Sequence, residues 1–88
     1  KLNRAWALMI TMIIHIANQE PVKVDVESMP NPGDQVLICK NPRERNDKPF
    51  SWIDDGVTTV IFPWWRINYV QVMPTGEDII EFPLWYRE

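Results

Sequence analysis

The stretch Gly56–Val72, with the sequence GVTTVIFPWWRINYVQV, most constrains the fold of this chain. Two apolar, β-branched runs, Val57–Phe62 and Ile67–Val72, flank a Pro-Trp-Trp-Arg sequence. Such residues favour a pleated, half-buried surface, so both runs are predicted to be strands. Pro63 cannot donate to a strand ladder and is expected to end the first of them. The sequence therefore predicts two strands joined by a tight aromatic turn.

Further short strands are predicted upstream of this stretch. In the run 22–27, valine alternates with charged residues, which predicts a strand with one buried face and one wet face. The residues 29–34 are rich in proline, asparagine and glycine and predict a loop, followed by a short strand at Val36–Cys39. Asn41–Asp55 is predicted to be either a long polar loop or an extension of a hairpin.

The two ends of the chain are less regular. The β-branched residues within Ile10–Ile16 favour a strand, which we place at Leu8–Ile16 after a short helical or irregular start at Leu2–Ala7. A helix through the whole run is the alternative. Ile79–Tyr86 is apolar and aromatic but contains a proline, so it is predicted to be an edge strand or a docked tail.

Length and composition limit the function. Eighty-eight residues are expected to form one domain, 1–88, with a barrel core at 8–72 and a C-terminal extension at 73–88. The chain is 45% hydrophobic and has five Trp. A domain of this size buries only about 60–65% of its unfolded surface, so some apolar area is expected at an interface. The net charge of −3 argues against a general electrostatic attraction to nucleic acid.

The cellular context is predicted from what the sequence contains. The apolar run Ala5–Ile16 is shorter than the roughly 20 residues that span a bilayer, so no membrane partner is expected. No small-residue cleavage site follows it, which argues against a signal peptide. A single cysteine, Cys39, excludes an internal disulfide and fits a reducing compartment. These features predict a cytoplasmic protein.

The predicted elements indicate a mainly β fold: a small, strongly bent, five-stranded antiparallel barrel. Their order resembles the Sm-like family, which includes the Sm, LSm and Hfq ring proteins. Residues 60–62 match the end of that family's fourth strand, and Pro63-Trp64 stands where the family has Arg-Gly. The apolar positions of its fifth strand match Ile67, Tyr69, Val70 and Val72. A plain SH3-like barrel has almost the same pattern.

The resemblance implies a homo-oligomeric ring in which the last strand pairs with the fourth strand of the next copy. The implied interface residues are Val57, Thr59, Ile61, Ile67, Tyr69 and Val70. In Sm-like rings two loops line the pore and bind uridine-rich, single-stranded RNA. The positions here that match those loops are Asn31, Asp34, Trp64, Trp65 and Arg66.

Each of these residues also has a structural interpretation. The tryptophans could stack on unpaired bases with Arg66 on phosphate, or they could fill the barrel end and an interface while Arg66 pairs with a carboxylate. Asn31 and Asp34 are turn residues that commonly bind their own backbone. Lys40, Arg43 and Arg45 form the one basic cluster, which could attract an anionic partner or could be a solvated loop.

The sequence does not indicate an enzyme. His15 is the single histidine, and no His/Cys cluster has the spacing of a metal site, so no metal or other cofactor is expected. Cys39 lies in an apolar run and is interpreted as a small buried hydrophobe. Two function classes remain. One is an Sm-like ring that binds RNA or serves as an RNA-associated scaffold. The other is a small-barrel assembly subunit without a nucleic-acid ligand.

Overall fold

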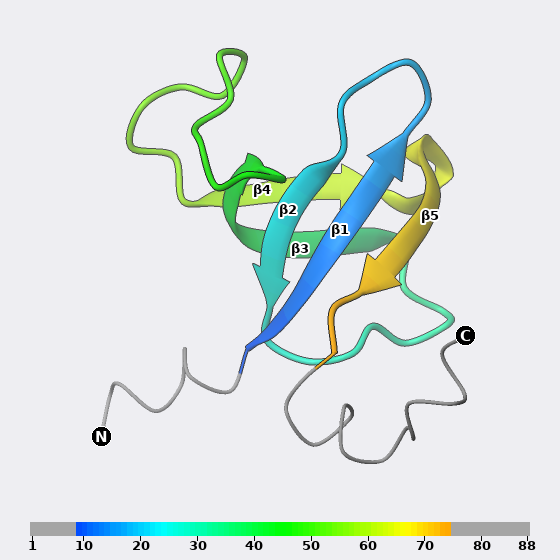
Figure 1. Ribbon diagram of the computed structural model, residues 1–88. Helices are drawn as coiled ribbons and strands as arrows, with labels where there is room; N and C mark the ends of the chain where they lie inside the picture. The colour runs from blue at the N-terminus through cyan, green and yellow to red at the C-terminus, as the bar shows by residue number, and fades with distance from the viewer. Residues whose placement is uncertain (1–8, 75–88) are drawn as a thin grey trace, which may run out of the picture.

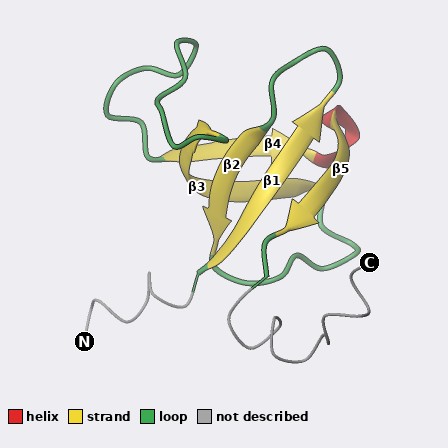
Figure 2. Cartoon of the chain, viewed as in Figure 1, coloured by secondary structure: helices red, strands yellow, loops and turns green. Residues whose placement is uncertain are grey.

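The computed structural model describes residues 9–74, and their five strands form one antiparallel sheet that is strongly curled into a half-barrel (Figure 1). The strands are β1 (Ile10–Ile16), β2 (Val22–Val26), β3 (Val36–Glu44), β4 (Thr59–Pro63) and β5 (Ile67–Val72). A 3₁₀ turn, η1 (Trp64–Arg66), joins β4 to β5 (Figure 2). The prediction of a bent, five-stranded antiparallel β fold is confirmed.

The sheet has the strand order β4-β3-β2-β1-β5, so β4 and β5 are its outer strands. Successive side chains of a strand point to opposite faces, and the valines of β2 all face inward. Val24 lies opposite Met12 of β1, and both are buried. The concave face of the sheet therefore holds a single core, made of Met12, Ile14, Ile16, Val22, Val24, Val26, Leu37, Cys39, Phe50 and Phe62.

A bulge bends β3 in its middle. Lys23 pairs with Arg43 but Asp25 pairs with Lys40, so β3 has one extra residue between the two pairs. Asn41 lies in this bulge with φ 53°, a left-handed conformation that asparagine tolerates better than most residues. The bend lets the two halves of β3 serve different neighbours, β4 at its start and β2 at its end.

Several strand boundaries differ from the prediction. β1 begins at Ile10 and β4 at Thr59, both later than expected, and β2 ends at Val26, one residue early. β4 ends at Pro63, as the sequence predicts. β3 continues through Glu44, so the hairpin extension is confirmed for 41–44 and the loop alternative is wrong there. The remaining loop, 45–58, supplies Phe50 to the core, which the sequence analysis did not anticipate.

Two predicted segments, Leu2–Ala7 and Ile79–Tyr86, lie outside the described residues. Within residues 9–74, no helix has the length and apolar character needed to cross a membrane.

The burial of Val24 gives a stability test of the strand register. The substitution Val24→Asp places an unpaired carboxylate in the core and should cost several kcal/mol, enough to unfold a domain of ordinary stability. Lys23→Gln, one residue away on the outer face, removes only an exposed ion pair with Asp47 and should cost less than about 1 kcal/mol. Urea unfolding followed by circular dichroism measures both. Equal losses in the two variants would contradict the inward orientation of Val24.

Candidate interaction site

The aromatic turn η1 is fixed by backbone hydrogen bonds at both of its ends. The Trp64 amide donates to the Gln35 carbonyl at 3.0 Å, and the Ile67 amide donates to the Trp64 carbonyl. The Trp64 indole packs against the core, and its buried Nε1 has no acceptor among residues 9–74. Trp64 therefore closes one end of the barrel, which agrees with its structural interpretation.

Trp65 and Arg66 face outward from the same turn. The Trp65 side chain is 80% exposed, and the Arg66 guanidinium carbon lies 5.7 Å from the centre of its ring. This is a cation–π distance, which holds the guanidinium over the indole. Within the described residues, Arg66 forms no salt bridge. An exposed aromatic surface and a cation are thus presented together.

Three of the predicted RNA-binding residues share one hollow of about 420 Å³. Asn31, Asp34 and Trp64 line it together with Pro30 and Pro32. The Asn31 amide donates to the Asp34 carboxylate at 3.0 Å, and the Asp34 amide donates to the Asn31 carbonyl at 3.0 Å. The carboxylate therefore already serves its own loop, as expected of a turn residue. Trp65 and Arg66 are not among the residues that line this hollow.

Arg66 instead lines a second hollow, of about 260 Å³, beside β4. Gln19, Trp52 and Ile61 line it as well. Trp52 comes from the loop 45–58, is half exposed, and stacks obliquely on Phe50 at 5.0 Å between ring centres. The sequence analysis did not select Trp52 as a site residue. An aromatic pair inside a polar loop was the signal that could have identified it.

The two outer strands present unpaired backbone groups. The Trp64 amide donates to the Gln35 carbonyl, and the Asn41 amide donates to the Thr58 carbonyl. In an antiparallel pair every second residue bonds to the neighbouring strand, so these two bonds show which residues of β4 bond to β3. The N–H and C=O groups of the residues in between, Thr59 and Ile61, point away from β3.

The same argument applies to β5. The Met73 amide donates to the Thr11 carbonyl, so the N–H and C=O groups of Val70 and Val72 point away from β1. Within residues 9–74, both outer edges of the sheet are therefore free.

The predicted interface residues fall into two groups. Val57, Thr59, Ile61 and Tyr69 are exposed, and Tyr69 stacks on His15 at 4.2 Å between ring centres. Ile67 and Val70 are half-buried and pack against the core. The first group has side chains available to a partner, whereas Val70 offers its backbone groups.

Of the basic cluster, Arg43 is the residue that pairs with carboxylates within residues 9–74. Both terminal nitrogens of Arg43 donate to Asp25, at 3.2 and 3.3 Å, and its Nε donates to Asp47. Asp25 also accepts from Thr11 and Asn41. Arg43 thus ties β3 to β2 on the outer face, and the structural interpretation is favoured for it.

The side chains of Cys39 and His15 are the two groups in the described residues whose chemistry could suggest catalysis, and each has a structural role instead. Cys39 is fully buried, and burial raises the pKa of its thiol to about 12, so it remains protonated at neutral pH. His15 Nε2 lies 2.6 Å from Gln71 Oε1 on the outer face. No group of three or more potential metal ligands occurs in the part of the chain that the structure describes.

No protein-family model, curated protein or solved structure matches this chain.

The ion pair of Asp25 with Arg43 and the hydrogen bonds that Asp25 accepts predict an acid-dependent stability. Burial opposes ionisation of Asp25, but hydrogen bonds from Asn41, Arg43 and Thr11 outweigh it and hold its pKa below the ordinary 3.8. A lowered carboxyl pKa stabilises the fold above the unfolded-state pKa, and this contribution is lost as the pH falls through the folded-state value.

We therefore expect Asp25→Asn to lower the free energy of unfolding by roughly 1–3 kcal/mol at pH 7. The difference from wild type should shrink as the pH falls below about 3.8. Urea titrations between pH 7 and pH 2 measure it. Asp55→Asn, in an exposed turn, is the control and should change little at any pH. A difference that persists unchanged at the lowest pH would contradict the assignment.

Proposed function

We propose that this chain is the subunit of a closed homo-oligomer of small barrels, a ring of the Sm-like type. In this ring, β5 of one copy adds to β4 of the next. The observation that carries the proposal is that the half-barrel ends in two free strand edges with exposed apolar side chains beside them. Free edges of this kind readily accept a further strand.

The backbone groups of the two edges have matching spacing. The outward-pointing residues are Thr59 and Ile61 on β4, and Val70 and Val72 on β5. In an antiparallel pairing, Thr59 faces Val72 of the next copy and Ile61 faces its Val70. Each such pair exchanges two hydrogen bonds. Pro63 has no N–H to donate, so it limits the pairing at the end of β4.

Side chains near the β4 edge favour a protein partner. Ile61 is 57% exposed and lines the hollow that also contains Trp52 and Arg66. Trp and Arg are enriched at protein interfaces, and a strand added to β4 would cover this hollow. Because the two edges belong to different strands, the contact is head-to-tail, and a head-to-tail contact forms a ring when the rotation between successive copies closes.

The oligomeric state tests the proposal directly. Light scattering after size-exclusion chromatography should give a closed oligomer for the wild-type chain at micromolar concentration. Ile61→Lys places a charge at the β4 edge and should shift the population towards monomer. Asn46→Lys is the control, because it adds the same charge in an exposed turn that lies on neither outer strand. A wild-type monomer would overturn the proposal.

Binding of single-stranded RNA is a second candidate, favoured by the exposed Trp65 beneath Arg66. An exposed indole can stack on an unpaired base, and a nearby guanidinium can stack or contact phosphate. The chain carries a net charge of −3, so few phosphates are neutralised and the affinity should depend weakly on salt. A small-barrel assembly subunit without nucleic acid is the alternative.

Fluorescence anisotropy with short uridine-rich and adenine-rich oligonucleotides at low salt separates these two functions. If RNA binds, Trp65→Ala with Arg66→Ala should reduce the affinity by about tenfold or more, since stacking contributes roughly 1–3 kcal/mol per base. Trp65→Phe retains an aromatic face and should keep most of the affinity. No binding by the intact oligomer at tens of micromolar would favour the assembly subunit alone.

A further inference from the structure

A third strand edge lies inside the sheet, along the first half of β3. The residues of β3 that bond to β4 are Leu37 and Cys39, so the backbone groups of Val36 and Ile38 point to the opposite side. On that side the pairing with β2 ends at Asp25 and Lys40. Within residues 9–74, the N–H and C=O groups of Val36 and Ile38 have no backbone partner.

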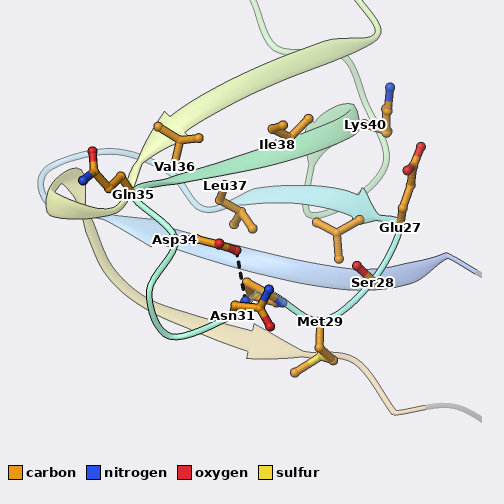
Figure 3. A pocket seen from close by; sticks show the side chains of 12 residues that line it. Glu27, Ser28, Met29, Asn31, Asp34, Gln35, Val36, Leu37, Ile38 and Lys40 are labelled. Atoms are coloured by element: carbon orange, nitrogen blue, oxygen red, sulfur yellow. Dashed lines mark hydrogen bonds between the residues drawn. The ribbon is translucent and has the colours of Figure 1, made fainter.

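This edge is open because β2 stops early. After Val26 the chain enters a loop that contains Pro30 and Pro32, which cannot donate to a ladder. The loop swings away from β3 and leaves a groove of about 550 Å³ where β2 would otherwise continue. Figure 3 shows the groove between Val36–Lys40 and the loop carrying Met29 and Asn31.

The groove has the properties of a site for an added strand. Met29, Val36 and Ile38 are exposed apolar residues along it, and polar residues such as Glu27 and Lys40 line its rim. Leu37, which is buried, lies at its floor on the core side. A strand placed here therefore meets apolar side chains on both of its faces and unpaired backbone groups along one edge. Extended peptides bind such edges by β-addition.

We propose that the C-terminal segment of this same chain, Ile79–Tyr86, occupies the groove as an added strand on β3. The segment reads IIEFPLWY and is apolar at all but one side chain. The linker between β5 and this segment is long enough for the segment to reach the groove. Val72 and Val24 both face Met12 from opposite sides, so the end of β5 lies two strand spacings, about 10 Å, from β2. The nine residues from Pro74 to Phe82 are joined by eight steps and extend up to about 26 Å.

Pro83 determines the register of the added strand. Its missing N–H must point away from β3, so the residues that bond to β3 are Phe82 and Leu84 or their even-numbered neighbours. Pairing Phe82 with Ile38 and Leu84 with Val36 places Pro83 over Leu37. A shift that pairs Ile80 with Ile38 would instead place Glu81 over Leu37 and bury its carboxylate against the core. The proposed strand therefore pairs Phe82 with Ile38, antiparallel to β3.

Amide hydrogen exchange in the full-length chain tests this pairing. The amides of Val36, Ile38, Phe82 and Leu84 should exchange at least about tenfold more slowly than unprotected amides. Leu37 and Cys39, whose amides bond to β4, are internal controls that should be protected in every variant. Unprotected amides at Val36 and Ile38 in the wild-type chain would overturn the proposal.

A pair of proline substitutions tests the register. Leu84→Pro removes a bonded N–H and should release Val36 and Ile38 to fast exchange. Glu81→Pro removes an N–H that points away from β3 and should leave them protected. Equal effects of the two variants, or no effect of either, would contradict the assigned register. The result does not depend on the ring, because the groove lies on β3 and the ring edges lie on β4 and β5.

A spin label identifies which chain supplies the strand. Cys39 is fully buried, so a nitroxide attached to a Glu88→Cys variant labels the introduced thiol. Broadening of the Val36 and Ile38 signals within the labelled chain is the expected result. When labelled chains are mixed with isotopically enriched, unlabelled chains, the enriched chains should show no broadening. Broadening only between different chains would show a swapped segment from a second copy and overturn occupancy by the chain's own segment.

Discussion

The structure depends on one constraint, which is that five short strands must bury a single apolar face. Val22, Val24 and Ile14 lie at the centre of that face and are fully buried, which is possible only if the sheet curls around them. The bulge at Asn41 supplies part of the curvature by bending β3 between its two partners. The curl is that of a half-barrel, so the sheet retains outer edges that a closed barrel would eliminate.

These edges concentrate the unsatisfied backbone groups of the described chain. β4 and β5 each leave two residues with outward N–H and C=O groups, and β3 leaves two more where β2 ends. Water satisfies such groups in a monomer, but exposed apolar side chains beside them make a protein strand the better partner. The proposed ring and the proposed added strand both follow from this single property, at different edges.

Two cations on the outer face are held by ion pairs that join strands, since Arg43 and Lys23 are engaged by Asp25 and Asp47. Within residues 9–74, Lys40 donates to Thr59 instead of a carboxylate, and Arg66 lies over an exposed tryptophan. The surface beside β4 and η1 is therefore mainly aromatic and apolar, and it carries one cation, Arg66, next to the exposed Trp65.

The sequence by itself determined the strands and their faces. Alternating valines in 22–26 and β-branched runs at 57–62 and 67–72 specify strands because side-chain periodicity is a local property. It also predicted that Cys39 is buried, because it lies within an apolar run.

Only the tertiary structure decided which residues meet. It extended β3 beyond Cys39, because the cross-strand bonds of Arg43 and Glu44 to β2 compensate for the polar sequence there. It separated Trp64, which packs on the core, from Trp65, which faces solvent; adjacent identical residues carry no local signal for that choice. It also left the β3 edge open, because the loop with Pro30 and Pro32 runs away from β3, and no local sequence pattern specifies that path. The local sequence pattern was enough to predict which segments are strands. Which residues bond across strands, which tryptophan packs at the end of the barrel and which edges stay open depend on contacts between residues distant in sequence.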